Sequence, residues 1–226
     1  MSLLCMILSL AALLTGCADH KYAVGYDRPA APELTGAAID VMPFIDARPD
    51  SEHTGAGTGL LNSSTYDTMY TEPVADGIAR TLISELRAAG FAASDDPRSS
   101  AQFLVSGVVL NFRAMRVPPF ESFIPYVNNV TWLWTNDSIA VSLRVKIVAT
   151  DRVRDFRLLE KTYDVSNDTA VWVGFLNLDS RVNTFTRQDL AELLQIGLRG
   201  IMQDIVADIR QALELKNLPA TAGAGF

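Results

Sequence analysis

The feature that most constrains this chain is its N-terminal apolar run, which carries no charged side chain and ends in Leu14-Thr15-Gly16-Cys17. A short apolar run closed by Leu-x-Gly-Cys is the pattern of a bacterial lipoprotein signal, in which the cysteine thiol receives a lipid before the preceding peptide bond is cut. We therefore expect residues 1–16 to be a signal peptide and Cys17 to be the lipidated start of the mature chain. The folded part of the protein is therefore expected to lie after Cys17.

Two other interpretations of this run are a transmembrane anchor and a buried core helix. The run is shorter than the roughly 20 apolar residues that span a bilayer, and the tract after it is loose and interrupted by Pro29, Pro32 and Gly36. Attached acyl chains can hold a protein stably on a membrane. By the sorting pattern of enterobacterial lipoproteins, Ala18 after the lipidated cysteine favours the outer membrane, with the protein facing the periplasm.

The composition narrows the classes of protein to which this chain could belong. The formal charge of -7 and the pI near 4.8 oppose nucleic-acid binding, because that affinity comes from clustered Lys and Arg. The content of 49% hydrophobic and 20% charged residues is typical of a folded globular domain. Because Cys5 leaves with the signal and Cys17 takes the lipid, no disulfide is expected. We predict a flexible tether over 17–36, one domain over 37–216 and a disordered tail over 217–226.

Hydrophobic periodicity predicts the elements of that domain. A helix over residues 74–90, capped by Thr71 or Glu72, repeats its apolar residues every fourth position, and a second amphipathic helix runs over 186–213. The predicted fold is α+β, a single domain in the order β-α-β-β-β-α, with a mostly antiparallel sheet of about four strands and two helices packed on one face. The strands are expected at residues 38–45, 103–116, 138–150 and 156–165.

Asp46 and Arg48, after the first strand, are the one polar pair that stands out. We expect a local ion pair or strand-end cap of small energetic weight, or else a polar contact used in binding. His53 and the glycine-rich tract 55–59 follow, but phosphate binding needs glycines that run directly into a helix, and zinc needs three or four ligands. With two histidines in the chain, no catalytic set can be assembled. We therefore expect no enzyme, no metal and no cofactor.

Two apolar stretches, residues 117–136 and 169–185, are longer than strand connections need. Either they close over the core, or they form one exposed aromatic surface, because amphipathic aromatic side chains favour interfaces and the lipid boundary. Antiparallel neighbouring strands would bring both stretches to the same end of the sheet. The candidate interaction residues are Phe120, Phe123, Tyr126, Trp132, Trp134, Trp172 and Phe175.

Several pieces of the chain resemble the YajG-type outer-membrane lipoproteins. The matching pieces are Leu14–Cys17, Asp46-x-Arg48, Leu82–Phe91 and the closing helix with Ile205–Ile209. The resemblance covers most of residues 38–214, and it implies a small α+β domain on the outer membrane with no catalytic residues to carry over. The long stretch 117–136 departs from that family.

A weaker resemblance is to the curli secretion lipoproteins of the CsgG family. It is carried by Ser138–Val145 with the hairpin after it, and by two excursions in the same places in the order. It implies an alternative function, a homo-oligomeric secretion channel, although each pore hairpin would need two strands of about 9–11 residues. The alternation expected of lipid-facing strands is poor over Val117–Tyr126. We favour a non-enzymatic, lipid-anchored accessory module that binds another envelope protein.

Overall fold

The computed structural model describes residues 21–34, 36–55, 63–96, 100–117, 136–172 and 187–217. The signal peptide and residues 218–226 of the expected tail lie outside these ranges. The described strands are β1 (Ala38–Val41), β2 (Ile45–Asp46), β3 (Ser63–Ser64), β4 (Ala92–Ser94), β5 (Phe103–Val117), β6 (Asn136–Asp151) and β7 (Phe156–Trp172). The described helices are α2 (Asp50–Thr54), α3 (Val74–Ala88) and α5 (Arg187–Asn217), with a 3-10 turn, η1, at Asp67–Met69.

The described strands form one mixed sheet in the order β4-β1-β5-β6-β7. β5, β6 and β7 make an antiparallel meander, as predicted, whereas β1 pairs in parallel with both β4 and β5. The α+β class is confirmed, but the expectation of about four mostly antiparallel strands was wrong. The first predicted strand, 38–45, is divided into β1 and the start of β2. The unpredicted strands β3 and β4 have two and three residues and are too short to show an alternating pattern.

β5 lies in the middle of the sheet, as its apolar residues on both faces predict. A bulge between Val109 and Asn111 shifts the inward-facing positions, so that both Val109 and Phe112 are at most 1% exposed. Gly107 leaves room for the ring of Phe44, because a Cβ at that position would lie 2.4 Å from a ring carbon. The core therefore lies between β5 and the helices.

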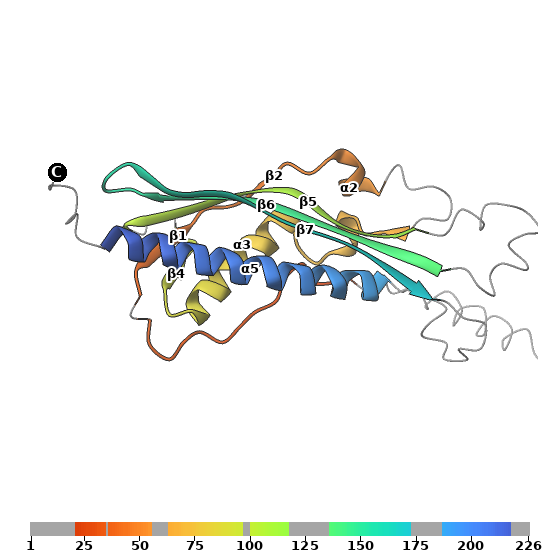
Figure 1. Ribbon diagram of the computed structural model, residues 1–226, viewed down its shortest axis with the longest axis horizontal. Helices are drawn as coiled ribbons and strands as arrows, with labels where there is room; N and C mark the ends of the chain where they lie inside the picture. The colour runs from red at the N-terminus through yellow and green to blue at the C-terminus, as the bar shows by residue number, and fades with distance from the viewer. Residues whose placement is uncertain are drawn as a thin grey trace, which may run out of the picture.

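α3 and α5 pack on the same face of the sheet, as predicted (Figure 1). Gly197 of α5 lies over Val141 of β6 and Val165 of β7, and Asp208 lies beside Tyr163, so α5 runs antiparallel to β7. The helix thus buries its apolar stripe against the sheet, as its broad 3.6-residue period predicts. The buried positions of that stripe are Leu190, Leu194, Leu198, Ile201, Ile205, Ile209 and Leu213.

The sequence predicts the C-terminal end of α3 better than its N-terminal end. Gly90 has a φ of 91°, the left-handed conformation expected after the last turn. At the other end Pro73 is the N-cap and no side-chain cap bond is formed, so the predicted cap at Thr71 or Glu72 was wrong. Glu72 instead accepts a hydrogen bond from Arg80 at 2.6 Å.

Residues 21–34, the strap, belong to the expected tether but pack against the domain. Tyr22 forms a β-bridge beside η1, and Val24 is fully buried. A Cβ on Gly77 of α3 would lie 2.6 Å from Val24, so the helix backbone and the strap are in close contact. Gln195 of α5 also donates to a strap carbonyl at 2.8 Å. Over this range the segment expected as a flexible tether therefore packs against the domain through isolated apolar residues such as Val24.

β7 extends beyond its predicted end at Val165 and reaches Trp172, which is in register with Asn136 of β6. Residues 169–172, assigned above to an apolar excursion, are therefore part of the sheet. Asn167 and Asp168 have low strand propensity, and pairing with β6 overrides that preference. At the other end of this hairpin, residues 152–155 form a polar turn.

Candidate functional site

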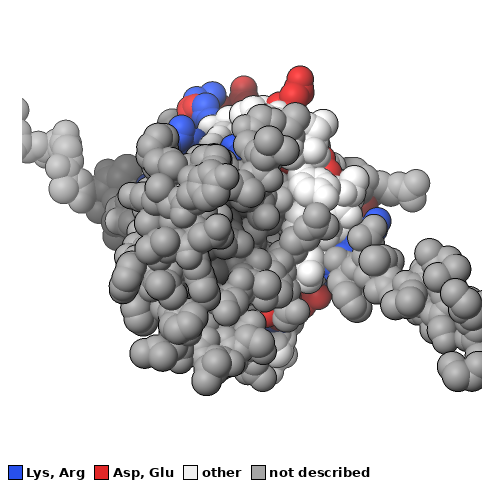
Figure 2. Space-filling view, turned by 90° about the vertical axis from the view of Figure 1, so that its right-hand side faces the viewer, with Lys and Arg blue, Asp and Glu red and all other residues white. Residues whose placement is uncertain are grey.

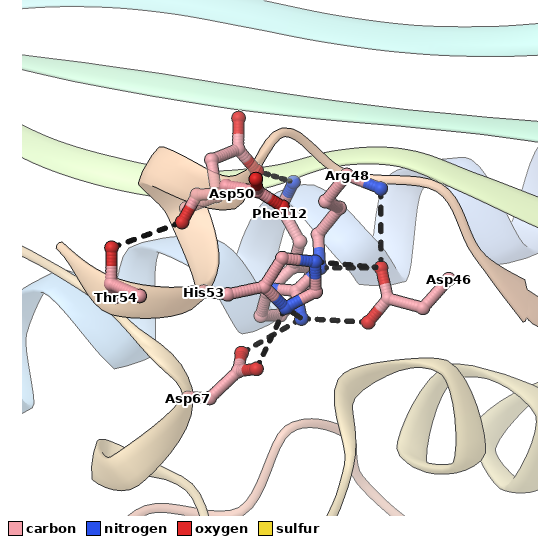
Figure 3. Close-up of polar contacts among 8 residues, drawn as sticks. Asp46, Arg48, Asp50, His53, Thr54, Asp67 and Phe112 are labelled. Atoms are coloured by element: carbon pink, nitrogen blue, oxygen red, sulfur yellow. Dashed lines mark hydrogen bonds and ion pairs between the residues drawn. The ribbon is translucent and has the colours of Figure 1, made fainter. Parts of the chain in front are cut away.

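A cluster of charged side chains lies beside β5, in the segment that runs from β2 to η1. We call Asp46, Arg48, His53 and Asp67 the Arg48 cluster. Asp46 ends β2, Arg48 follows it, His53 lies in the last turn of α2 and Asp67 begins η1. Three short elements are thus joined at one point (Figure 3).

Arg48 is the centre of the cluster, and its side chain is 1% exposed. Its Nε donates to Asp46 Oδ1 at 2.9 Å and its Nη2 donates to Asp46 Oδ2 at 2.7 Å, the two-pronged geometry of arginine with a carboxylate. Nη2 also donates to Asp67 Oδ1 at 2.7 Å. Among the described residues Nη1 has no hydrogen-bond partner. One buried guanidinium therefore holds two carboxylates.

His53 is a partly exposed member of the cluster, with 29% of its side chain exposed. Its Nδ1 is 2.8 Å from Asp67 Oδ2, and its Nε2 is 3.9 Å from Asp46 Oδ1. The hydrogen bond with Asp67 raises the pKa of His53 above its ordinary value, against the opposing effects of burial and of the Arg48 charge. The protonated ring is the form that suits a position between two carboxylates.

The ion pairs also fix the charges of Asp46 and Arg48. Burial alone would raise the pKa of Asp46, but hydrogen bonds from Arg48 and its positive charge outweigh burial, and the pKa is lowered. Burial alone would lower the pKa of Arg48, and the carboxylates of Asp46 and Asp67 outweigh it, so that this pKa is raised. Both groups are therefore fully charged at neutral pH.

Beside the cluster, side chains complete the edge of β5. Glu52 of α2 is 4% exposed, and its Oε2 accepts a hydrogen bond from the Phe112 N–H at 2.9 Å. The Thr65 hydroxyl oxygen accepts one from the Ala114 N–H at 3.1 Å. These bonds fall between the short pairings that β2 and β3 make with β5. Side-chain oxygens thus replace a neighbouring strand, since a buried N–H needs a partner.

The arrangement is suited to holding segments together. Arg48 is engaged with both of its carboxylates, and His53 is held by one of them. Within the ranges that the structure describes, no group of three His, Cys, Asp or Glu side chains could hold a metal ion. We interpret the Arg48 cluster as a clasp that links β2, α2 and η1 beside the edge of β5.

The structure joins Asp46 and Arg48 in an ion pair, and it adds residues that the sequence does not single out for this site. His53 stands out in the sequence as an isolated metal-ligand type, whereas Glu52 and Asp67 do not stand out at all. Arg48 and Asp67 are 19 residues apart, and no short-range pattern links them. The tertiary packing of the segment against β5 brings them together.

Most of the candidate aromatic surface lies outside the described residues. Trp172 is the exception, because the backbone of β7 reaches it and pairs it with Asn136. The aromatic candidates that lie outside the described ranges are Phe120, Phe123, Tyr126, Trp132, Trp134 and Phe175. Cys17, the candidate lipidation site, also lies outside them.

The attachment points of the two aromatic stretches lie at one end of the sheet. Val117, which ends β5, is in register with Ser138, and Trp172, which ends β7, is in register with Asn136. Val117 and Trp172 therefore end β5 and β7 at the same end of the sheet, as the antiparallel order predicts (Figure 1). Figure 2 views the molecule from this end, and the described surface visible there mixes basic with acidic side chains at its rim.

Comparison with known proteins shows the fold of the chain. No protein-family model matches it, and no curated protein matches it. The solved structure of protein XCC0632 from Xanthomonas campestris, a DUF330 protein, matches 86% of this chain and 97% of that one, with a TM-score of 0.54 and 9% identity.

Two further solved structures match with lower TM-scores. A homolog of the neuraminyllactose-binding hemagglutinin from Helicobacter pylori has a TM-score of 0.49 and 9% identity, over 87% of this chain and 98% of that one. Lipoprotein GNA1162 from Neisseria meningitidis has a TM-score of 0.26 and 12% identity, over 77% of this chain and 99% of that one. Among the described helices, none is both long and apolar enough to cross a bilayer. The chain is thus similar in fold to XCC0632.

Proposed function

We propose that this chain is a lipid-anchored protein of the bacterial cell envelope that binds another envelope protein through its two aromatic stretches, without catalysis. The observation that carries the proposal is the shared attachment of both stretches at the end of the sheet where β5 and β7 finish (Figure 1). The lipid on Cys17 and the outer-membrane location belong to the same proposal, and the motif Leu14–Cys17 supports them.

The strap supports an orientation for such a protein. Gln195, near the start of α5, donates to the Ala23 carbonyl, and Tyr22 pairs with Tyr70. α5 runs antiparallel to β7, so its start lies toward the end from which the aromatic stretches leave. Cys17 precedes Lys21 by four residues, which can span at most about 14 Å. A lipid on Cys17 would therefore keep the aromatic end of the domain close to the membrane.

The composition of the two stretches suits an interface at that end. Residues 118–135 include two tryptophans and a single charged residue, Glu121. Trp and Tyr are enriched in the centres of protein interfaces and at the membrane boundary, because they combine a large apolar area with a polar group. A partner protein in the same membrane could contact both stretches at once.

A crosslinking pull-down from membranes of cells that produce the full chain tests the proposal. Trp132→Ala and Phe123→Ala are expected to remove the captured partner while leaving the Tm unchanged. Phe156→Ala is the matched control, because Phe156 is 62% exposed and lies at the opposite end of the β6–β7 hairpin. Capture that is equally strong with all three variants would contradict a role for the aromatic stretches.

The anchor is tested separately by metabolic labelling with a palmitate analogue. The chain is expected to take up the label, and Cys17→Ser is expected to abolish it and to release the protein from the membrane fraction. Label that persists in Cys17→Ser would contradict lipidation at that sulfur.

A further inference from the structure

An open groove lies at the end of the molecule opposite to the aromatic stretches, between the β6–β7 turn and the last turns of α5. Its volume is about 560 Å³, and it is lined by Asp151, Arg154, Phe156, Leu158, Ala212 and Leu215. Small-molecule sites commonly have volumes of roughly 300–1,000 Å³ and mostly apolar walls with a few polar groups. The groove therefore has the size and the kind of lining that such sites share.

The walls of the groove are large apolar side chains that the fold leaves exposed. Phe156 on the strand side is 62% exposed and Leu215 on the helix side is 60% exposed. Phe156 is in register with the buried Asp151, so its side chain is on the inner face of the sheet, toward α5. Val153, in the adjoining turn, is 77% exposed. Such a concentration of exposed apolar side chains at one place is a mark of a binding surface.

The polar groups of the groove differ in whether they are already used. The Asp151 carboxylate is buried, and it accepts hydrogen bonds from the Val153 N–H at 3.0 Å and from Gln102 at 3.3 Å. The Arg154 guanidinium, by contrast, forms no ion pair within the described part of the chain. Arg154 is also the one cationic side chain among the lining residues that the structure describes. The groove thus offers a free positive charge beside two apolar walls.

We propose that this groove binds one free fatty-acid molecule, with its acyl chain between Phe156 and Leu215 and its carboxylate at Arg154. The walls match an alkyl chain, whose transfer out of water is favourable for each methylene buried. A guanidinium holds a carboxylate through two parallel hydrogen bonds. Among the described lining residues Arg154 alone is cationic, so a single carboxylate matches the charge better than a group with several negative charges.

The test uses the purified full-length chain and a diazirine-bearing dodecanoic acid as a photoreactive probe. After irradiation, mass spectrometry is expected to find saturable labelling confined to residues 151–158 and 212–217. Laurate, decanoate and octanoate then compete with the probe. The half-competition concentration is expected to rise about two- to four-fold for each methylene removed.

Variants of the groove test the two halves of the ligand. Arg154→Gln is expected to weaken laurate competition about three- to ten-fold while leaving competition by dodecanol unchanged, because the alcohol has no charge. Arg157→Gln is the matched control, since Arg157 pairs with Glu160 outside the groove lining. Ala212→Phe fills the groove and is expected to abolish labelling. If its Tm shows that it does not fold, Leu215→Ala, at an exposed position, is expected to weaken laurate several-fold.

Several results would overturn the proposal. Labelling that spreads along the chain without saturation shows non-specific partition into apolar surface. Competition that does not depend on chain length would show that the acyl chain does not lie in the groove. Equal effects of Arg154→Gln and Arg157→Gln would show that the carboxylate is not bound at Arg154. Labelling that appears only after deletion of residues 218–226 would assign the groove to the chain's own C-terminal segment.

Discussion

The Arg48 cluster and the ion pairs on the outer face of β6 and β7 use the same chemical groups in two environments. The Arg48 side chain is 1% exposed, whereas Arg144, which pairs with Asp164 at 3.0 Å, is 49% exposed. An exposed pair gains little, because water screens the charges and both side chains lose freedom. A buried guanidinium depends on its carboxylates, because water cannot replace them. The number of ion pairs therefore says little about where electrostatics stabilise this fold.

The two regions also differ in what else holds their elements together. Arg144 and Asp164 lie opposite each other on strands that already share a long antiparallel ladder. Asp46 and Asp67, by contrast, lie in short elements: β2 pairs with β5 at two positions, and η1 is a single turn. Where the backbone supplies few hydrogen bonds, side chains carry a larger share of the attachment.

The largest effect is expected from Arg48→Ala, which separates two carboxylates from their buried partner. We expect a loss of about 3 kcal/mol in the free energy of unfolding, at the low end for a buried pair because Asp46 and Asp67 are partly exposed and can take up water. Urea unfolding measures it. Arg48→Lys is expected to recover part of the loss, since an ammonium cannot bind Asp46 with two prongs. Equal losses of unfolding free energy for Arg48→Ala and Arg144→Ala would contradict the distinction between the buried and the exposed ion pairs.

A smaller loss is expected from Glu52→Ala, which leaves the Phe112 N–H without its acceptor. An unsatisfied buried donor costs about 1–3 kcal/mol. Glu52→Gln is the matched control, because its amide oxygen can still accept this hydrogen bond. Hydrogen exchange at the Phe112 amide is expected to accelerate in Glu52→Ala and much less in Glu52→Gln. Unchanged exchange in both variants would contradict the view that this side chain completes the strand edge.

The elements that the sequence predicts are those whose period extends over many residues. α3, α5 and β6 each repeat their apolar positions across most of their length, so their type and packing face can be derived. β4 (Ala92–Ser94), by contrast, is too short to show a period, and it forms by pairing in parallel with the edge of β1. The strap docks through single residues such as Val24, which carry no periodic signal. These parts depend on surfaces that exist only after the core has formed.

The candidate site likewise has a part that the sequence predicts and a part that depends on tertiary packing. Asp46 and Arg48 are two residues apart, and their pairing can be expected from the sequence, but the sequence favours a loop pair of small energetic weight. The burial of Arg48 follows from the packing of the segment between β2 and η1 beside β5, and the same packing brings in His53 and Asp67. Burial, which decides the energetic weight of the pair, is a tertiary property.

The pH dependence of stability is expected to separate the two regions through His53. Its pKa is raised in the folded state by Asp67, so protonation stabilises the fold. This contribution is fully present below the unfolded pKa near 6.5 and is lost as the pH rises through the higher folded value. The Tm difference between the native chain and His53→Gln, measured from about pH 5.5 to 8.5, is therefore expected to shrink as the pH rises. A constant difference would contradict the contact with Asp67.

The smallest effect is expected from the exposed pair. A double-mutant cycle of Arg144→Ala and Asp164→Ala is expected to give a coupling of about 0.2–1 kcal/mol at low salt. Because the Debye length falls to about 3 Å in 1 M salt, this coupling is expected to vanish there, whereas the loss caused by Arg48→Ala persists. The same cycle with Arg48 and Asp46 at both salt concentrations is the control. A coupling at the exposed pair that matches the buried one and resists salt would show that burial does not set the difference between the two regions.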